Sequence, residues 1–427
     1  MVNCAVRSRS TITWLMLIIL LLPTLIFYLG LSSSMALGTT FAAALVLLIV
    51  IVDRPRGPER TSKTLVRPGR VLATIGTLCV VLMIHLAVAS IESPIQATRA
   101  LASMIPLALL ITGAASLAGY LQRATPAEVH RAMQCCFFFL TVIALLGVVG
   151  LFPTTGRFFI KPVFPFTEPS HFALAFTPFL LYVCVTSTGR RRMAYLLVGF
   201  ALAALLQNLT LVIACTLATL VSLQIGRLVV FVAIFAIAAG QFDLSYFADR
   251  LNFSAETQNL SSLVYLQGWQ LIAESWRNSA GIGLGFQQLG TQGTGVGAAD
   301  LIQAILGDDL NLLDGGFTLA KILGEFGYLG IALCAAYLLK AWHSARVLRK
   351  FATSDAGASP VEVFAHCAVT GYLVEMFVRG TGYFTATGLL LVAGLWLTAR
   401  RSSVAKLRRG TRPHRSQKSA LSYEVDP

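Results

Sequence analysis

The chain of 427 residues has charged side chains at only 12% of its positions, while 56% of its residues are hydrophobic and the mean hydropathy is +0.74. An ordinary soluble domain has roughly 25% charged residues. About twelve membrane spans of ~20 residues would use ~240 residues, which matches the hydrophobic fraction. This composition excludes a soluble enzyme, a nucleic-acid-binding protein and a disordered scaffold. It predicts an all-α polytopic membrane protein.

Apolar runs predict about twelve transmembrane helices in a single integral membrane domain, 1–427. The first run is longer than the core of a secretory signal and a second run follows almost at once, so we expect it to be retained as a helix. The predicted spans are 11–30, 35–52, 71–90, 99–120, 134–152, 170–187, 194–207, 209–225, 228–240, 317–339, 361–378 and 381–398.

The net charge of +14 is distributed unevenly between the predicted loops. With the N-terminus in the cytoplasm, 26 of the 33 basic residues lie in the inner segments 1–10, 53–70, 121–133, 188–193, 226–227, 340–360 and 399–427. Basic residues accumulate in cytoplasmic loops, so we expect both termini inside. Dropping one of the short runs within 194–240 would place the cluster from Lys340 to Lys350 outside, which favours twelve helices. We assign the basic excess to helix orientation and anionic lipid headgroups, and we expect the tail 399–427 to be disordered.

The largest predicted external (periplasmic) loop is 241–316, which has eight carboxylates, two arginines and a net charge of −6. Its segment 261–276 has a helical apolar rhythm, so we expect an amphipathic helix at the membrane interface. The sequence GIGLGFQQLG that starts at Gly281 predicts tight turns, and no strand precedes it, which argues against a dinucleotide site. This loop contains no cysteine, so no disulfide framework or zinc site is predicted.

Basic residues in the predicted external segments indicate function more specifically than the overall charge does. An outer surface selects against them, so those that persist are expected to bind an anion. Guanidinium groups bind phosphate oxygens bidentately, and no aspartate-rich metal motif accompanies them, so we expect phosphate binding without a metal ion. Pairing with the loop carboxylates is the open alternative. The five residues are Arg157, Lys161, Arg250, Arg277 and Arg379.

Carboxylates near external helix ends are the candidate bases. Glu168 precedes the sixth predicted helix and His171 follows three residues later, so Glu168 is a candidate general base. A favourable contact with the helix dipole is the alternative for Glu168. The pairs Lys321–Glu325 and Glu375–Arg379 are spaced i, i+4, and each could be a structural ion pair.

Five motifs resemble, in order and sidedness, the bacterial O-antigen polymerases, which share a superfamily with the O-antigen ligases. They are FTEPSHFA at the sixth helix, SLVYLQGWQ and GIGLGF in the large loop, LLDGGFTLAKILGEFGYLG entering the tenth helix, and FVRGTGYF before the last helix. The resemblance covers about 160–400 by motif and the first 150 residues by hydropathy. It implies a metal-independent, cofactor-free glycosyltransferase of the Gram-negative inner membrane.

The implied reaction transfers a growing glycan from undecaprenyl diphosphate to the next lipid-linked repeat unit on the periplasmic face. Membrane lipid and a chain-length regulator protein are the implied partners. The reaction needs cations beside the diphosphate and a base near the acceptor hydroxyl. The expected catalytic residues are Glu168, Asp314 and Arg277, and the expected binding residues are Arg157, Lys161, His171, Arg250, Arg379 and Tyr383.

Two departures from the superfamily pattern matter. The ligases carry a histidine nine residues before the Glu of an E-x-G turn, but counting back from Glu325 gives Gly316, and Asp314 is the closest acid or base. This favours a polymerase over a ligase. An arginine common in the loop helix is replaced within 262–266, which leaves Arg277 or Arg250 to serve.

A flippase or transporter would show internal repeats and charges near the membrane midplane, and neither is seen.

Overall fold

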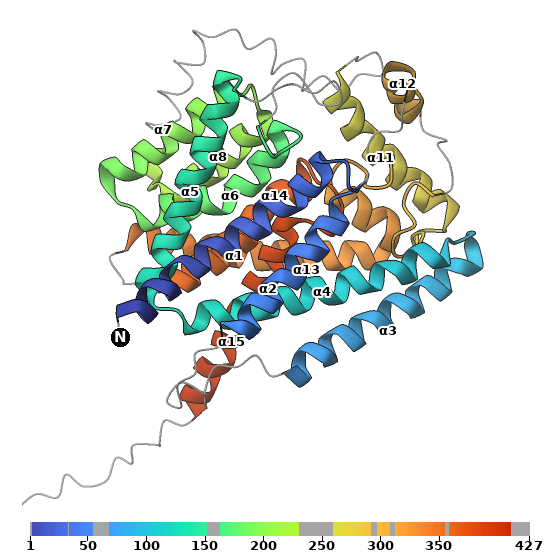
Figure 1. The fold of residues 1–427 in the computed structure, drawn as a ribbon. Helices are drawn as coiled ribbons and strands as arrows, with labels where there is room; N and C mark the ends of the chain where they lie inside the picture. The colour runs from blue at the N-terminus through green and yellow to red at the C-terminus, as the bar shows by residue number, and fades with distance from the viewer. Residues whose placement is uncertain are drawn as a thin grey trace, which may run out of the picture.

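The computed structural model describes residues 2–32, 34–53, 68–151, 163–229, 259–291, 297–307, 312–354 and 358–410. These residues form α-helices and turns, apart from an isolated β-bridge between Val163 and Phe166. The helices (Figure 1) are α1 (Val2–Tyr28), α2 (Met35–Val52), α3 (Pro68–Glu92), α4 (Ala97–Arg123), α5 (Pro126–Val149), α6 (Pro169–Thr186), α7 (Gly189–Leu205), α8 (Leu209–Ser222), α11 (Leu260–Asn278), α12 (Gly297–Leu306), α13 (Thr318–Thr353), α14 (Pro360–Phe377) and α15 (Ala386–Gly410).

Seven of the described helices are long and apolar enough to cross a membrane, namely α1 to α6 and α13. The expectation of an all-α, multi-pass membrane protein is therefore confirmed at this coarser level. Eleven of the twelve predicted apolar runs coincide with helices, although α7 and α8 have only 17 and 14 residues. The predicted span at 228–240 lies almost entirely outside the described residues. A total of twelve spans stays a prediction.

The helix α6 is the centre of the bundle. Its apolar window is 83% buried, whereas that of α3 is 17% buried. Phe172, Phe176 and Phe179 on α6 are fully buried, which is the packing expected of a helix surrounded by protein rather than by lipid. Pro169 opens α6 because its fixed φ suits the first helical position. The preceding Glu168 is extended, as the residue before a proline prefers to be.

Contacts between loops define one end of the bundle, here called the Glu168 end. Asn208 donates to the carbonyl of Pro169, and Gln288 exchanges two hydrogen bonds with the backbone of Gln96. Thr381 contacts Met35 at the start of α2. These turns are the ones that the charge pattern assigns to the external side.

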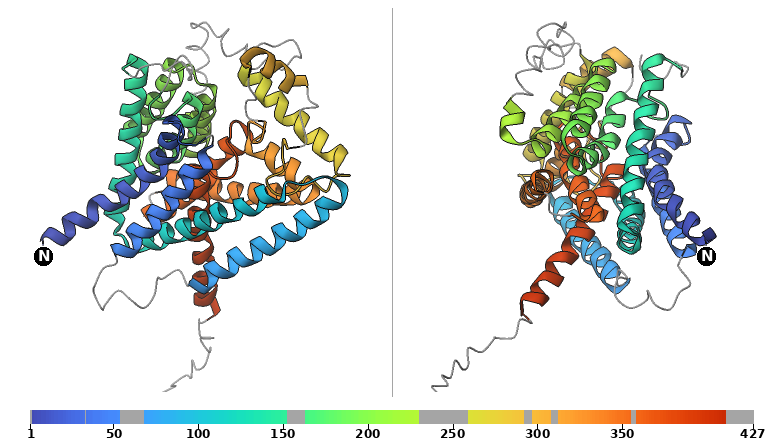
Figure 2. Two further views of the ribbon diagram at one scale, coloured as in Figure 1. Left: turned by 45° about the vertical axis from the view of Figure 1, so that its right-hand side comes forward. Right: turned by 90° about the vertical axis from the view of Figure 1, so that its left-hand side faces the viewer.

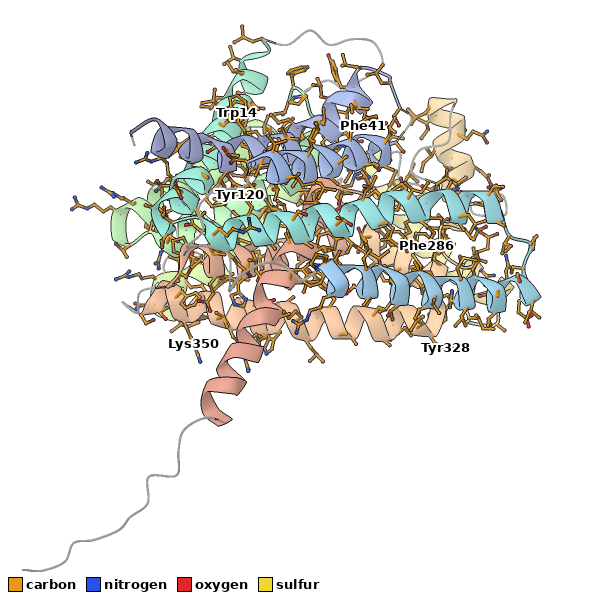
Figure 3. The ribbon with its side chains drawn as sticks, turned by 60° about the horizontal axis from the view of Figure 1, so that its bottom comes forward. Trp14, Phe41, Tyr120, Phe286, Tyr328 and Lys350 are labelled. Carbon is orange, nitrogen blue, oxygen red and sulfur yellow. The ribbon has the colours of Figure 1, made fainter. Side chains whose placement is uncertain are left out.

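Buried polar contacts define the opposite end, here called the Arg192 end. Arg192 donates to the carbonyls of Ser187, Ser222 and Ala352, at the carboxyl ends of α6, α8 and α13. Tyr120 near the end of α4 donates to the carboxylate of Asp53. The charge pattern assigns all of these segments to the cytoplasmic side. Figure 3 shows both ends of α13: Lys350 lies at the Arg192 end, and Tyr328 lies toward the other end.

The helix α13 is broken at Gly327, which has φ 51° and ψ −126°. In a continuous helix the carbonyls of residues 323–325 would accept from the N–H groups of residues 327–329. Here they accept instead from the side chain of Trp276 and from the backbones of Leu284 and Gly285. Trp276 of α11 and the glycine-rich segment 281–290 therefore supply the donors that the broken helix lacks.

The predicted amphipathic helix at 261–276 is confirmed as α11, which packs against α13 and α12. The helix α11 runs from α12 to the neighbouring ends of α3 and α4 (Figure 2), where Ser93 donates to the carbonyl of Asn278. Trp276 packs onto the break in α13 through its indole N–H, at 2.9 Å from the carbonyl of Leu323. The predicted turns of GIGLGF are confirmed, since Gly281, Gly283 and Gly285 all have positive φ.

Candidate functional site

The loop 378–385, between α14 and α15, connects the motifs that the sequence singled out. The N–H of Gly380 donates to the carbonyl of Gly316 at 2.9 Å. A Cβ on Gly382, which has φ 92°, would lie 2.6 Å from Oδ1 of Asp314. Only a glycine allows this close approach, so the sequence FVRGTGYF packs directly onto LLDGGFT.

On one side of this loop, Arg379 pairs with Glu168 at the start of α6. One guanidinium nitrogen, Nη2, lies 3.0 Å from Oε1 and 2.9 Å from Oε2 of Glu168, and Ser170 donates to Oε2 at 2.7 Å. The side chains of Glu168 and Arg379 are 19% and 12% exposed. Burial alone would raise the pKa of Glu168, but Arg379, His171 and the hydroxyl of Ser170 outweigh it and hold the pKa at about 2.

His171 lies one helical turn beyond Glu168 on α6. Its Nδ1 lies 3.1 Å from the hydroxyl of Thr167, which fixes the orientation of the ring. Its Nε2 is buried and has no hydrogen-bond partner among the described residues. Buried ring nitrogens normally have a partner, so this atom is suited to a hydroxyl of a bound ligand or to a water molecule.

On the other side of the loop, Lys321 is buried in the first turn of α13. Its Nζ lies 2.6 Å from the carbonyl of Leu313, 3.1 Å from Oδ1 of Asp314 and 3.7 Å from Oε1 of Glu325. The side chain of Lys321 is 2% exposed and that of Asp314 is 32% exposed. Asp314 is therefore the member of this cluster that external molecules can reach.

Tyr383 closes the cluster from the 378–385 loop. Its hydroxyl donates to Oε2 of Glu325 at 2.8 Å, while the N–H of Leu289 donates to Oε1 at 3.3 Å. The Tyr383 ring stacks on Phe286 of the glycine-rich segment, with 5.9 Å between ring centroids. Burial and the neighbouring Glu325 carboxylate raise the pKa of Tyr383.

The expected i, i+4 pair of Glu375 and Arg379 is wrong. The helix α14 ends at Phe377, so Arg379 lies on the following loop and turns to Glu168. Glu375 stays in the bundle core, where Thr387 donates to its Oε2, and no side chain or backbone group of the described ranges bonds its Oε1. The pair of Lys321 and Glu325 does form, but Asp314 shares the ammonium group.

Five of the nine predicted site residues meet at the Glu168 end, namely Glu168, His171, Asp314, Arg379 and Tyr383. Arg277 lies on the exposed last turn of α11, where its Nε donates to the carbonyl of Ala273, and it makes no ion pair with a described residue. Arg157, Lys161 and Arg250 lie outside the described residues. Lys321 and Glu325 belong to the site but were not predicted there. Their signal in the sequence was a charged pair within an apolar helix, which is typical of functional residues.

No protein-family model, curated protein or solved structure matches this chain. Within the described ranges, no group of three or more His, Cys, Asp or Glu side chains could hold a metal ion. The cluster instead offers one guanidinium, one ammonium, three carboxylates, one phenol and one imidazole. These groups can bind an anion and accept a proton.

Proposed function

We propose that this protein is an O-antigen or related surface-polysaccharide polymerase. It transfers a growing glycan from undecaprenyl diphosphate to the next lipid-linked repeat unit on the periplasmic face of the inner membrane. It acts as a metal-independent glycosyltransferase, with membrane lipid and a chain-length regulator as partners.

One observation carries the proposal. Residues from α6, the 312–317 turn, the first turn of α13 and the 378–385 loop meet at a single end of the bundle. Arg379 and Tyr383 are four positions apart, so their Cα atoms lie within about 14 Å of each other. Cations and carboxylates this close suit a reaction in which an anion leaves and a hydroxyl loses its proton.

In the proposed reaction, a hydroxyl oxygen of the acceptor sugar attacks the anomeric carbon of the donor glycan. The bond between that carbon and the diphosphate oxygen breaks, and its electron pair leaves with undecaprenyl diphosphate. Arg379 binds the leaving diphosphate, because its planar guanidinium matches two phosphate oxygens. The proton of the acceptor hydroxyl passes to a carboxylate of the cluster.

Glu168 and Asp314 remain the two candidate bases. Glu168 is a weak base while Arg379 holds it, since its pKa is about 2. A diphosphate that draws Arg379 away would remove the main stabilising charge and raise the proton affinity of Glu168. Asp314 is the more exposed carboxylate and bonds Lys321 through one oxygen, Oδ1. Its second oxygen suits an acceptor hydroxyl.

The ligase of the same superfamily is the second candidate. The position of its histidine is Gly316, whose φ is 73° and whose Cβ would clash with Val264. A histidine would not fit this backbone, so the polymerase is the better proposal.

Deletion of the gene tests the proposed function through the lipopolysaccharide and the lipid-linked intermediates that accumulate. We expect surface lipopolysaccharide with single repeat units and no ladder, because flipping and ligation continue without the polymerase. A bare core with long polymer on undecaprenyl diphosphate would identify a ligase instead. Single units stranded on the cytoplasmic face would identify a flippase.

A further inference from the structure

A cavity of about 450 Å³ lies at the Arg192 end of the bundle. It is formed where α6, α8 and α13 end and where α5, α7 and α14 begin. Because α6 has 18 residues, this cavity lies about 27 Å along the bundle from Glu168, which is close to the thickness of the hydrocarbon core. It is therefore separate from the site proposed above.

The charge of Arg192 is not neutralised by a carboxylate within the described part of the chain. Its guanidinium is buried and donates to three backbone carbonyls, those of Ser187, Ser222 and Ala352. These carbonyls belong to the carboxyl ends of three helices, whose partial negative charge stabilises the cation. Dipoles compensate a full charge only in part, so Arg192 leaves a net positive charge in the described lining of the cavity.

Two further side chains that can donate to an anion line the same cavity: the exposed Arg227, and His130 from α5, whose Nδ1 lies 3.0 Å from the hydroxyl of Tyr182. Arg192 and Arg227 line the same cavity, so the two cations repel each other unless an anion lies between them. The other polar lining groups, such as Thr188 and Ser354, are neutral, and no described carboxylate lines the cavity.

Exposed apolar side chains lie close in the sequence to the lining residues Gln224 and Arg227. Leu220 on α8 is 46% exposed, and Ile225 and Val229, two positions on either side of Arg227, are 67% and 62% exposed. In a membrane protein, exposed side chains of this kind contact acyl chains. A cavity that holds two arginines, next to a chain segment with exposed apolar side chains, matches a ligand that has a phosphate headgroup and a lipid tail.

We propose that this cavity binds the phosphate group of an anionic phospholipid from the leaflet opposite the Glu168 end. Arg227 and His130 contact the phosphate oxygens, while Arg192 supplies positive potential from behind. The occupant bridges α5, α7, α13 and the end of α8, so binding stabilises the packing of these helices.

The test titrates the detergent-solubilised full chain with phosphatidylglycerol and, separately, with phosphatidylcholine. Bound lipid is counted by native mass spectrometry and the unfolding midpoint is followed in parallel. We expect one phosphatidylglycerol to bind and raise the midpoint, with phosphatidylcholine binding at least about tenfold more weakly. Arg227→Gln and His130→Gln should each weaken phosphatidylglycerol binding by about tenfold.

Arg190→Gln is the matched control, because Arg190 is exposed on the same end of α7 and does not line the cavity. It should leave lipid binding unchanged. An equal loss in Arg190→Gln and Arg227→Gln, or equal binding of the two lipids, would overturn the proposal. If inorganic phosphate alone raised the unfolding midpoint fully, with no bound lipid, the proposed lipid occupant would be wrong. The cavity would then be assigned to a soluble phosphate compound.

Discussion

Arg379 holds Glu168 in the structure described here, and it is also the group that we expect to bind the leaving diphosphate. The two residues are 211 positions apart in the chain, and the ion pair between them joins α6 to the 378–385 loop. Removing one partner of a largely buried pair leaves an uncompensated charge. A test of function must therefore separate the loss of a phosphate contact from the loss of structure.

Arg379→Ala should reduce polymerisation at least about a hundredfold, since the charge developing on the leaving diphosphate loses its preorganised partner. Arg379→Lys should recover little activity, because an ammonium does not reproduce bidentate contacts. Both are measured as chain formation by membranes that contain equal amounts of protein.

The double variant Arg379→Ala/Glu168→Gln is the control for structure. Removing both charges should restore the unfolding midpoint lost in Arg379→Ala but should not restore activity. Recovery of activity together with stability would show that Arg379 acts only as a structural partner.

The Glu168–Arg379 pair should give the protein a defined pH dependence. The pKa of Glu168 is about 2 in the folded protein and 4.5 ordinarily, so the carboxylate stabilises the fold above pH 4.5. This contribution is lost as the pH falls from 4.5 toward 2. We expect the difference in unfolding midpoint between the parent and Glu168→Gln to be constant from pH 8 to 5 and to shrink below pH 4.5. The same substitution at the exposed Glu92 should produce no such difference, and a constant gap down to pH 3 would contradict the assignment.

At the scale of elements, the break in α13 determines where the cluster lies. Lys321 and Glu325 occupy the short segment before Gly327, and the glycine-rich segment holds that part through backbone bonds to residues 324 and 325. Phe286 of the same segment lies toward the Tyr328 end of α13 (Figure 3) and stacks on Tyr383. Discontinuous helices with satisfied backbone groups are a common way to place polar residues within a membrane protein.

Gly327→Ala should destabilise the protein by about 2–6 kcal/mol, because the backbone conformation disfavours a side chain and the Cβ would clash with Gly281 and Ile282. Gly76→Ala is the matched control, since Gly76 is exposed within α3 and a Cβ there meets nothing within 4 Å. It should be neutral or slightly stabilising. Unfolding midpoints of the purified variants measure both effects, and equal midpoints would contradict the role of the break.

At the scale of the whole molecule, apolar runs were enough to predict the helices from α1 to α8 and from α13 to α15. The pattern worked because lipid forces long apolar stretches to satisfy their own backbone groups. Spacing along one helix also predicted the contact of Lys321 with Glu325. The same reasoning failed for Glu375 and Arg379, because α14 ends between them and spacing carries no information beyond a helix end.

Long-range pairing could not be predicted in this way. Nothing local in the sequence indicates that Arg379 meets Glu168, or that Asp314 shares the ammonium of Lys321. The break at Gly327 was equally hidden, since the run from 317 to 339 is periodic and apolar on both sides of it. These features depend on how separate segments pack at the Glu168 end, which only the folded structure shows.

The predicted topology places α12 outside the cell membrane and the start of α7 in the cytoplasm. Gln303→Cys and Arg190→Cys are exposed positions on these two segments. An impermeant thiol reagent should label Gln303→Cys in intact spheroplasts and Arg190→Cys only after lysis, with the parent chain as the blank. The reverse pattern would invert the topology and place the Glu168 end in the cytoplasm.

Reconstitution of the purified protein tests the central claim most directly. Liposomes containing the protein and undecaprenyl-diphosphate-linked repeat units are incubated without other enzymes, and the lipid-linked products are resolved by mass. We predict chains of two, three and more repeat units, with one free undecaprenyl diphosphate released for each new linkage. Unchanged single units alongside their movement across the bilayer would contradict the claim and identify a transporter.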